Sequence, residues 1–278
     1  MKWKQFFTPA ESLDADEARS YMKTHREGSY TLLDVRQPGE YEQERIPGAK
    51  LIPLPDLPGR VSELDPEKPL IAYCAVGGRS RAAAQYLSGR GFQEVYNLKG
   101  GVAAWQGGKA VGPAETGMAY LEGHETLQEV VALAYGMEQG LAEFYRSVGG
   151  EAKDPQTREV LLKLAGIEEK HREKLFRLHL TLDSSADREK LESRVVPRVM
   201  EGGFTTDEFL EQNRAMLDTP VHVLSLAMML ETQAFDLYMR YAQKAKDEES
   251  RSVLHEIGEE EKAHMAALGR LMDATVQH

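Results

Sequence analysis

Short apolar runs alternate with polar, helix-like stretches between Thr8 and Gly101. A first helix is predicted over residues 8–23, where Thr8 serves as the N-cap and acidic side chains fill the first turns. Four runs have the length and the β-rich composition of buried strands: 30–36, 50–54, 69–73 and 94–98. Apolar strands that alternate with helices predict an α/β domain, a mostly parallel sheet flanked by helices on both faces.

The composition changes after a stretch that contains Gly107-Gly108 and Gly112-Pro113, because the chain becomes rich in Ala, Leu, Met, Glu and Lys. Long helices are predicted over 122–148, 155–181, 221–246 and 248–274. Between the second and the third, Pro197 and Gly202-Gly203 interrupt any long helix, so only short helical pieces are expected in 182–220. Four long helices with one long middle connection predict an all-α four-helix bundle with a crossover between helices two and three.

This change of pattern predicts two domains, residues 1–108 and 122–278, joined by a linker over 109–121. Residues 1–108 hold 14 basic and 14 acidic side chains, so the net charge of −11 lies in 109–278. Such an acidic protein binds the phosphate backbone of a nucleic acid poorly, so we expect no nucleic-acid partner. The apolar stretches are too short to span a membrane, and the start MKWKQFF has no apolar region of a signal peptide. We therefore expect a cytoplasmic protein without a membrane partner.

Cys74 is the one cysteine of the chain, which excludes an internal disulfide and a CxxC redox pair. It directly follows the third predicted strand, and a helix is expected to begin near Ala82. In the loop between them, Gly77-Gly78 allows the backbone amides to turn inward and Arg79 adds positive charge, which favours a thiolate. The alternative is an inert buried cysteine, but the glycine pair and the strand–loop–helix setting favour a nucleophile.

Five motifs within residues 5–106 resemble a single-domain rhodanese. In chain order they are Asp34-Val-Arg36, Glu40-Tyr41, Ile46-Pro-Gly-Ala49, the Cys74–Ser80 loop and Gly91-Phe through Trp105. The resemblance implies a sulfurtransferase in which Cys74 takes a sulfane sulfur from a donor, thiosulfate or another, as a persulfide. A thiol or another nucleophilic acceptor then receives the sulfur. It further implies that Arg79 orients the anionic donor and that the loop binds it through Ala75, Val76, Gly77, Gly78 and Ser80. Asp34 and Arg36 are predicted to be a structural pair.

The helical part repeats a set of reactive side chains at an offset of 93 residues. Glu138, Glu168, His171 and Tyr145 recur as Glu231, Glu261, His264 and Tyr238. The side chains one turn away from both first glutamates are largely apolar, so each carboxylate faces a core, where an unpaired charge is costly. In each Glu-x-x-His the carboxylate and the imidazole share one helix face and can reach one ion. One such motif arises easily by chance, but its repetition predicts a metal site, and oxygen-rich coordination with two imidazoles suits iron or manganese.

This ligand set resembles that of the ferritin-like di-iron carboxylate proteins, in particular rubrerythrins. In those proteins, two helices each contribute one glutamate, and the other two each contribute a Glu-x-x-His motif. The resemblance implies that the six residues hold two iron ions, with manganese or a mixed pair as alternatives, and react with peroxide or oxygen. Tyr145 and Tyr238 are predicted to donate hydrogen bonds behind the ligands. The chain lacks a CxxC…CxxC iron module, so redox turnover needs an external electron donor. A homo-oligomer is expected.

A second hypothesis belongs to another class. The helical bundle stores or senses metal, or serves in oligomerisation, while the rhodanese-like domain supplies the only catalysis.

Overall fold

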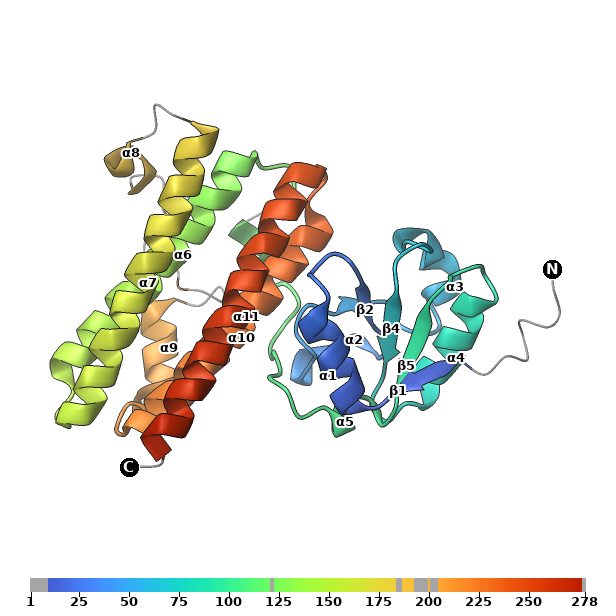
Figure 1. Ribbon diagram of the computed structural model, residues 1–278, viewed down its shortest axis with the longest axis horizontal. Helices are drawn as coiled ribbons and strands as arrows, with labels where there is room; N and C mark the ends of the chain where they lie inside the picture. The colour runs from blue at the N-terminus through green and yellow to red at the C-terminus, as the bar shows by residue number, and fades with distance from the viewer. Residues whose placement is uncertain (1–9, 121–122, 184–186, 193–199, 201–204, 277–278) are drawn as a thin grey trace. The chain divides into compact units, whose positions relative to one another are not determined.

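The computed structural model describes residues 10–120, 123–183, 187–192, 200 and 205–276 (Figure 1). The chain divides into two compact units, Met1–Ala114 and Glu115–His278. The division falls within the stretch expected to be a linker.

The first unit is built on a parallel five-stranded sheet of order β1-β5-β4-β2-β3. The strands are β1 (Glu11–Leu13), β2 (Thr31–Asp34), β3 (Lys50–Leu51), β4 (Leu70–Tyr73) and β5 (Val95–Leu98). Four of them fall on the four predicted apolar runs. The central strand β4 is buried along its whole length, as expected for a parallel sheet covered on both faces. The predicted α/β sheet is therefore confirmed.

The beginning of the chain differs from the prediction, because Glu11–Leu13 is strand β1, not helix. The first helix, α1 (Ala15–Thr24), starts at Asp14, whose carboxylate accepts hydrogen bonds from the amides of Asp16 and Glu17. The Glu17 side chain completes a capping box with the Asp14 amide. The predicted N-cap, Thr8, lies outside the described residues.

Helices cover both faces of the sheet, because successive strand residues point to opposite sides. The remaining helices of this unit are α2 (Pro38–Gln43), α3 (Leu57–Arg60), α4 (Gly78–Ser88) and α5 (Gly101–Ala104). Leu33 and Ala72 pack in one apolar cluster with α3 and α4. Leu32, Ile71 and Tyr73 pack in the opposite cluster with α1, α2 and α5.

Four long helices form the second unit: α6 (Leu127–Glu151), α7 (Pro155–Leu182), α10 (Pro220–Lys244) and α11 (Glu248–Val276). They occupy the four predicted stretches. Side-chain caps begin three of them, Thr126 at α6, Asp154 at α7 and Thr219 at α10. The connection between α7 and α10 contains α8 (Arg188–Glu192) and α9 (Thr206–Asn213). Pro197 and Gly202-Gly203 lie outside the described residues.

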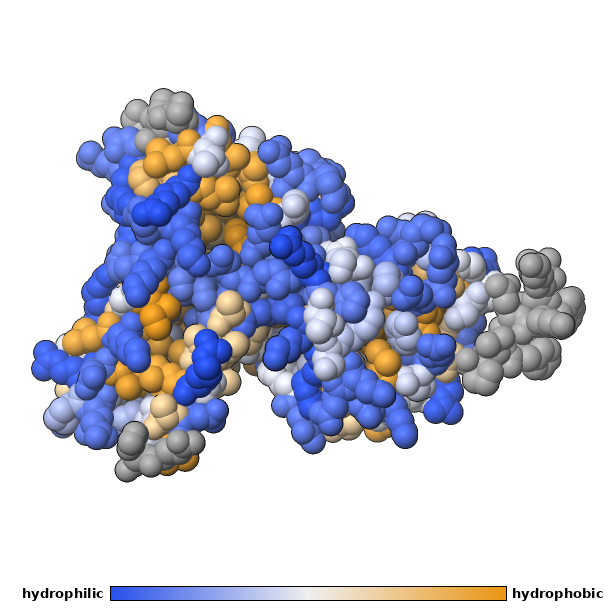
Figure 2. Space-filling view, viewed as in Figure 1, coloured by the Kyte–Doolittle hydropathy of each residue, from blue (hydrophilic) through white to orange (hydrophobic). Residues whose placement is uncertain are grey.

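The core of this unit consists of two apolar clusters at different levels along the helices. On α6 one cluster ends at Met137 and the other begins at Leu141; on α10 they meet between Leu230 and Ala234. The six repeated ligand candidates fall in the layer between the clusters. Figure 2 shows a largely hydrophilic outer face of these helices with smaller hydrophobic areas. In the described part of the chain, no helix combines the length and the apolar character that crossing a membrane requires.

Candidate active-site loop and metal centre

Cys74 lies at the carboxyl end of β4 and is only 1% exposed. Its Sγ accepts a hydrogen bond from the Gly77 amide at 3.1 Å and one from the Ser80 hydroxyl at 3.4 Å. Burial acts to raise the pKa of the thiol, but the hydrogen bonds from Ser80 and from the amides of Val76 and Gly77 outweigh it and lower that pKa. The loop therefore favours the nucleophilic thiolate.

Two glycines let the loop turn and let a neighbouring helix approach it. Gly77 has a φ of +93° and caps α4. Gly101 has a φ of +59°, and a Cβ there would lie 2.1 Å from the Cys74 carbonyl oxygen. This close approach allows the Val102 amide to donate to that oxygen at 2.8 Å and the Ala103 amide to donate to the Ala75 oxygen at 3.1 Å. The amino end of α5 thus fixes the first residues of the loop.

Ser80 is held by a chain of polar side chains that crosses to the edge of the sheet. Its hydroxyl donates to Asn97 Oδ1 at 2.7 Å, and Asn97 Nδ2 donates to Ser12 Oγ at 3.2 Å. Ser80 and Asn97 are both buried. Sequence reasoning gave Asn97 no role, because its partners lie 17 and 85 residues away.

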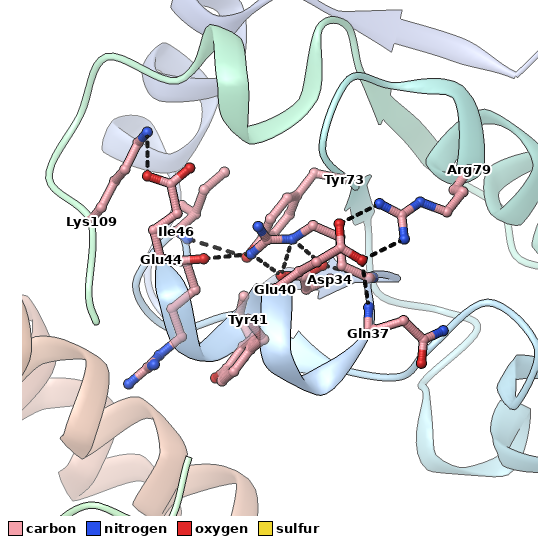
Figure 3. Close-up of polar contacts among 12 residues, drawn as sticks. Asp34, Gln37, Glu40, Tyr41, Glu44, Ile46, Tyr73, Arg79 and Lys109 are labelled. Atoms are coloured by element: carbon pink, nitrogen blue, oxygen red, sulfur yellow. Dashed lines mark hydrogen bonds and ion pairs between the residues drawn. The ribbon is translucent and has the colours of Figure 1, made fainter. Parts of the chain in front are cut away.

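Arg79 forms a bidentate ion pair with Glu40 of α2, at 2.7 and 2.6 Å (Figure 3). The pair holds the pKa of Glu40 down at about 2 and raises that of Arg79. Both side chains are about one-third exposed, at 36% and 34%. The Arg79 guanidinium, which is expected to orient an anionic donor, is therefore already paired with the Glu40 carboxylate. The sequence gave Glu40 a place in a motif but no partner.

The predicted structural pair is present: Arg36 donates two hydrogen bonds to the Asp34 carboxylate from Nε and one from a terminal nitrogen, and it reaches the Glu44 carbonyl oxygen. Asp34 and Arg36 are both buried. The hydrogen bond from Arg36 to Glu44 links the end of β2 to the residue that follows α2. The charge of Arg36 also contributes to the low pKa of Glu40.

The repeated residues of the second unit come together as two groups, Glu138 with Glu168 and His171, and Glu231 with Glu261 and His264. Within each group, one ligand atom per residue lies within 4.8 Å of the others, and all six residues are buried. The imidazole rings of His171 and His264 stack with centroids 3.5 Å apart and planes 3° from parallel. The two groups are therefore adjacent and could hold two neighbouring ions.

The donor set fits two divalent cations. Burial raises the pKa of Glu168. Burial also acts on Glu231, but hydrogen bonding to His264 and Glu261 lowers its pKa. Among the described residues, Glu168 Oε1 and His264 Nε2 are buried without a hydrogen-bond partner, and each such atom costs about 1–3 kcal/mol. A cation bound in each group would satisfy these two atoms, and carboxylate oxygen with imidazole nitrogen suits iron or manganese.

Tyr145 and Tyr238 are buried two turns beyond Glu138 and Glu231, one in each apolar cluster. Their hydrogen bonding to the ligands stays a prediction. Arg172, which sequence reasoning missed, follows His171 and donates to Tyr135 Oη at 2.7 Å and Glu192 Oε1 at 3.0 Å. It ties α8 to α6 and α7 beside the centre. No local pattern predicts these contacts, because the partners lie 37 and 20 residues away.

Comparison with known proteins finds two families in this chain. Residues 14–107 match the rhodanese-like domain family, and residues 222–277 match the rubrerythrin family. The protein YqhL of Bacillus subtilis is 49% identical over 76 residues, which are 27% of this chain and 60% of that protein. A sulfurtransferase of Allochromatium vinosum is 40% identical over 27% of this chain and 69% of its own length. The thiosulfate sulfurtransferase GlpE of Pseudomonas syringae is 37% identical over 29% of this chain and 76% of its own length.

Solved structures match the same part of the chain. A rhodanese-like domain protein from Staphylococcus aureus is 29% identical with a TM-score of 0.33, over 36% of this chain and 97% of that one. A rhodanese-like domain from Anabaena is 32% identical with a TM-score of 0.33, over 36% of this chain and 78% of that one.

Proposed function

The chain belongs to the rhodanese-like family through residues 14–107 and carries a rubrerythrin domain, and from this premise we propose that it carries out two reactions. One moves sulfane sulfur through a persulfide on Cys74. The other reduces peroxide or oxygen at a di-iron centre held by the six buried glutamates and histidines. The sulfurtransferase domain and the rubrerythrin di-iron domain follow from the family matches, which do not favour a bundle for metal storage, sensing or assembly alone.

The main support for the proposed sulfur transfer is the set of hydrogen bonds to Cys74 Sγ, which lower the pKa of the thiol. The Cys74 thiolate attacks the outer sulfur of a sulfane donor, the donor's S–S bond breaks, and the rest of the donor leaves with the electron pair. A thiolate acceptor then attacks the outer sulfur of the Cys74 persulfide, and the cysteine thiolate leaves. The Gly77 amide is placed to hold negative charge on sulfur before and after each transfer.

In the second unit, Glu138, Glu168 and His171 would hold one iron ion, and Glu231, Glu261 and His264 the other. Bound iron supplies the electrons for reducing peroxide. The four carboxylates would offset the charge of the ions, and the apolar clusters exclude water from the layer along the helix axes. The chain has one cysteine, in the first unit, so electrons come from an external donor.

Cys74→Ser tests the first reaction. We expect no mass gain of one sulfur atom after incubation with a sulfane donor, no sulfur transfer, and unchanged iron content. Sulfur transfer that persists in this variant contradicts the proposal.

The second reaction is tested by iron content and the optical spectrum before and after addition of peroxide to the reduced protein. We expect two irons per chain, a spectral change and loss of peroxide. The double variant Glu138→Ala/Glu231→Ala should lose all three. Stoichiometric iron binding without loss of peroxide would instead favour the hypothesis that the helical bundle stores or senses metal.

A further inference from the structure

A cavity of about 200 Å³ opens beside the candidate metal centre, between α7 and α11. Its lining includes His171 and His264, which are buried. It also includes Lys174 and Glu260, whose side chains are 61% and 47% exposed. The cavity therefore connects the histidines of the centre with the solvent.

The mouth of this cavity is charged. Lys174 of α7 forms an ion pair with Glu260 of α11, so one contact spans the opening. Glu256 lies one turn before Glu260 and also lines the cavity, which leaves one net negative charge among these three side chains. Because the ion pair is exposed, it is weak and opens readily.

Along the helix axes, the described residues on both sides of the centre are largely apolar. The two apolar clusters fill the core on either side of the ligand layer. A divalent cation that crossed them would lose its hydration without gaining ligands, which is prohibitively costly. By contrast, the cavity leads past acidic side chains to His264, whose Nε2 has no hydrogen-bond partner among the described residues.

We propose that this cavity is the route by which divalent cations reach and leave the centre, and that Lys174 controls the passage. Glu256 and Glu260 attract the hydrated ion, while the Lys174 ammonium repels it and holds Glu260 until their pair opens. The inference rests on the metal centre proposed above.

Cobalt(II) alone is the probe, because its visible absorption reports the ligand set directly. In Lys174→Met we expect Co²⁺ uptake by the metal-free protein and extraction by a chelator to be about five-fold faster at low salt. The amount bound at equilibrium should not change, since a route alters both rates but not the ligands. The difference from wild type should shrink at high salt, where exposed charges are screened.

Two further variants and a control separate charge from obstruction. Glu256→Gln should slow uptake about three-fold at low salt, because it removes an attracting charge. Leu178→Trp fills part of the cavity, which Leu178 lines, and should slow both uptake and extraction. The matched control is Lys163→Met, an exposed lysine on the same helix that does not line the cavity, and it should behave as wild type.

The outcomes distinguish the route from the centre. If the wild type binds no Co²⁺, the metal centre fails and the route fails with it. If Co²⁺ binds normally but Lys174→Met matches both the wild type and Lys163→Met in its rates, the centre stands and the route is wrong. Circular dichroism checks that Leu178→Trp folds. If it does not, Lys174→Met still tests the route, because the Lys174 side chain is exposed and its replacement should not disturb folding.

Discussion

The Ser80 hydroxyl has one proton and two acceptors within reach, Asn97 Oδ1 at 2.7 Å and Cys74 Sγ at 3.4 Å. When the thiol loses its proton, the negative sulfur competes better for this donor. Ser80 therefore stabilises the thiolate more than the thiol, which is the condition for lowering the pKa.

We expect Ser80→Ala to raise the pKa of Cys74, because the thiolate loses the hydrogen bond that the Ser80 hydroxyl donates. The thiolate fraction at neutral pH falls accordingly. The measurement is the rate of Cys74 alkylation by iodoacetamide as a function of pH. Ser88→Ala, on the same helix α4 but far from the sulfur in sequence, is the control and should leave the midpoint in place. A midpoint that stays or falls in Ser80→Ala contradicts this account.

Glu40 engages both terminal nitrogens of Arg79, so this arginine offers an anionic donor little uncompensated charge. The Glu40 pKa of about 2 keeps the carboxylate charged, and the pair intact, at neutral pH. We expect Glu40→Gln to raise kcat/KM for thiosulfate about three- to ten-fold relative to an organic persulfide, because a partly exposed charge is removed. Parallel assays with both donors measure this ratio.

The control for this prediction is Glu44→Gln, a second acid of the same surface, which pairs with Lys109 instead of Arg79. Its ratio should stay at the wild-type value. An equal loss with both donors in Glu40→Gln would mean that Glu40 only supports the structure of the loop.

At the scale of secondary-structure elements, the short helix α5 holds the beginning of the reactive loop directly. It spans Gly101–Ala104, and its first amides hold the Cys74 and Ala75 carbonyl oxygens. The approach is so close that no side chain fits at its first residue.

Gly101→Ala should therefore destabilise the first unit by about 2–4 kcal/mol, from the left-handed backbone and the clash with the loop. Sulfur transfer should fall because α5 no longer holds the loop. Chemical denaturation and a transfer assay measure the two effects. Gly39→Ala is the control, since a Cβ at this helical position meets nothing within 4 Å, and it should leave stability equal or slightly higher. Equal stability of Gly101→Ala and Gly39→Ala would contradict the proposed contact.

Elements with a strong local pattern were predictable from the sequence, and those made by distant contacts were not. The long helices and four strands follow from apolar periodicity, and the six ligand candidates from a set of residues that recurs at an offset of 93. By contrast, β1 is three residues long with mostly exposed side chains, and it is a strand because it pairs with β5, about 85 residues away. The Glu40–Arg79 ion pair could not be predicted either, because its two residues lie 39 positions apart in the sequence.

At the scale of the whole molecule, the division into two units predicts that a substitution that abolishes the activity of one unit leaves the activity of the other unchanged. The charge is divided too, since residues 1–108 are neutral and the net −11 lies beyond them. We expect Glu138→Ala/Glu231→Ala to keep wild-type sulfur transfer while it loses metal. A transfer assay on the metal-free double variant measures this. A parallel loss of sulfur transfer would show that the units depend on each other.

Metal binding should also stabilise only one of the two units. Ligand at 100 times its Kd adds about 2.7 kcal/mol to the state that binds it, and for a unit of this size that raises Tm by about 5–10 °C. Calorimetry of the metal-free and the Co²⁺-loaded protein should therefore show one transition that moves and one, from the first unit, that does not. In Glu138→Ala/Glu231→Ala the shift should vanish, because each group of the centre has lost one of its three ligand candidates. A shift of both transitions, or a shift that persists in the double variant, would contradict a metal centre formed by these residues of the second unit.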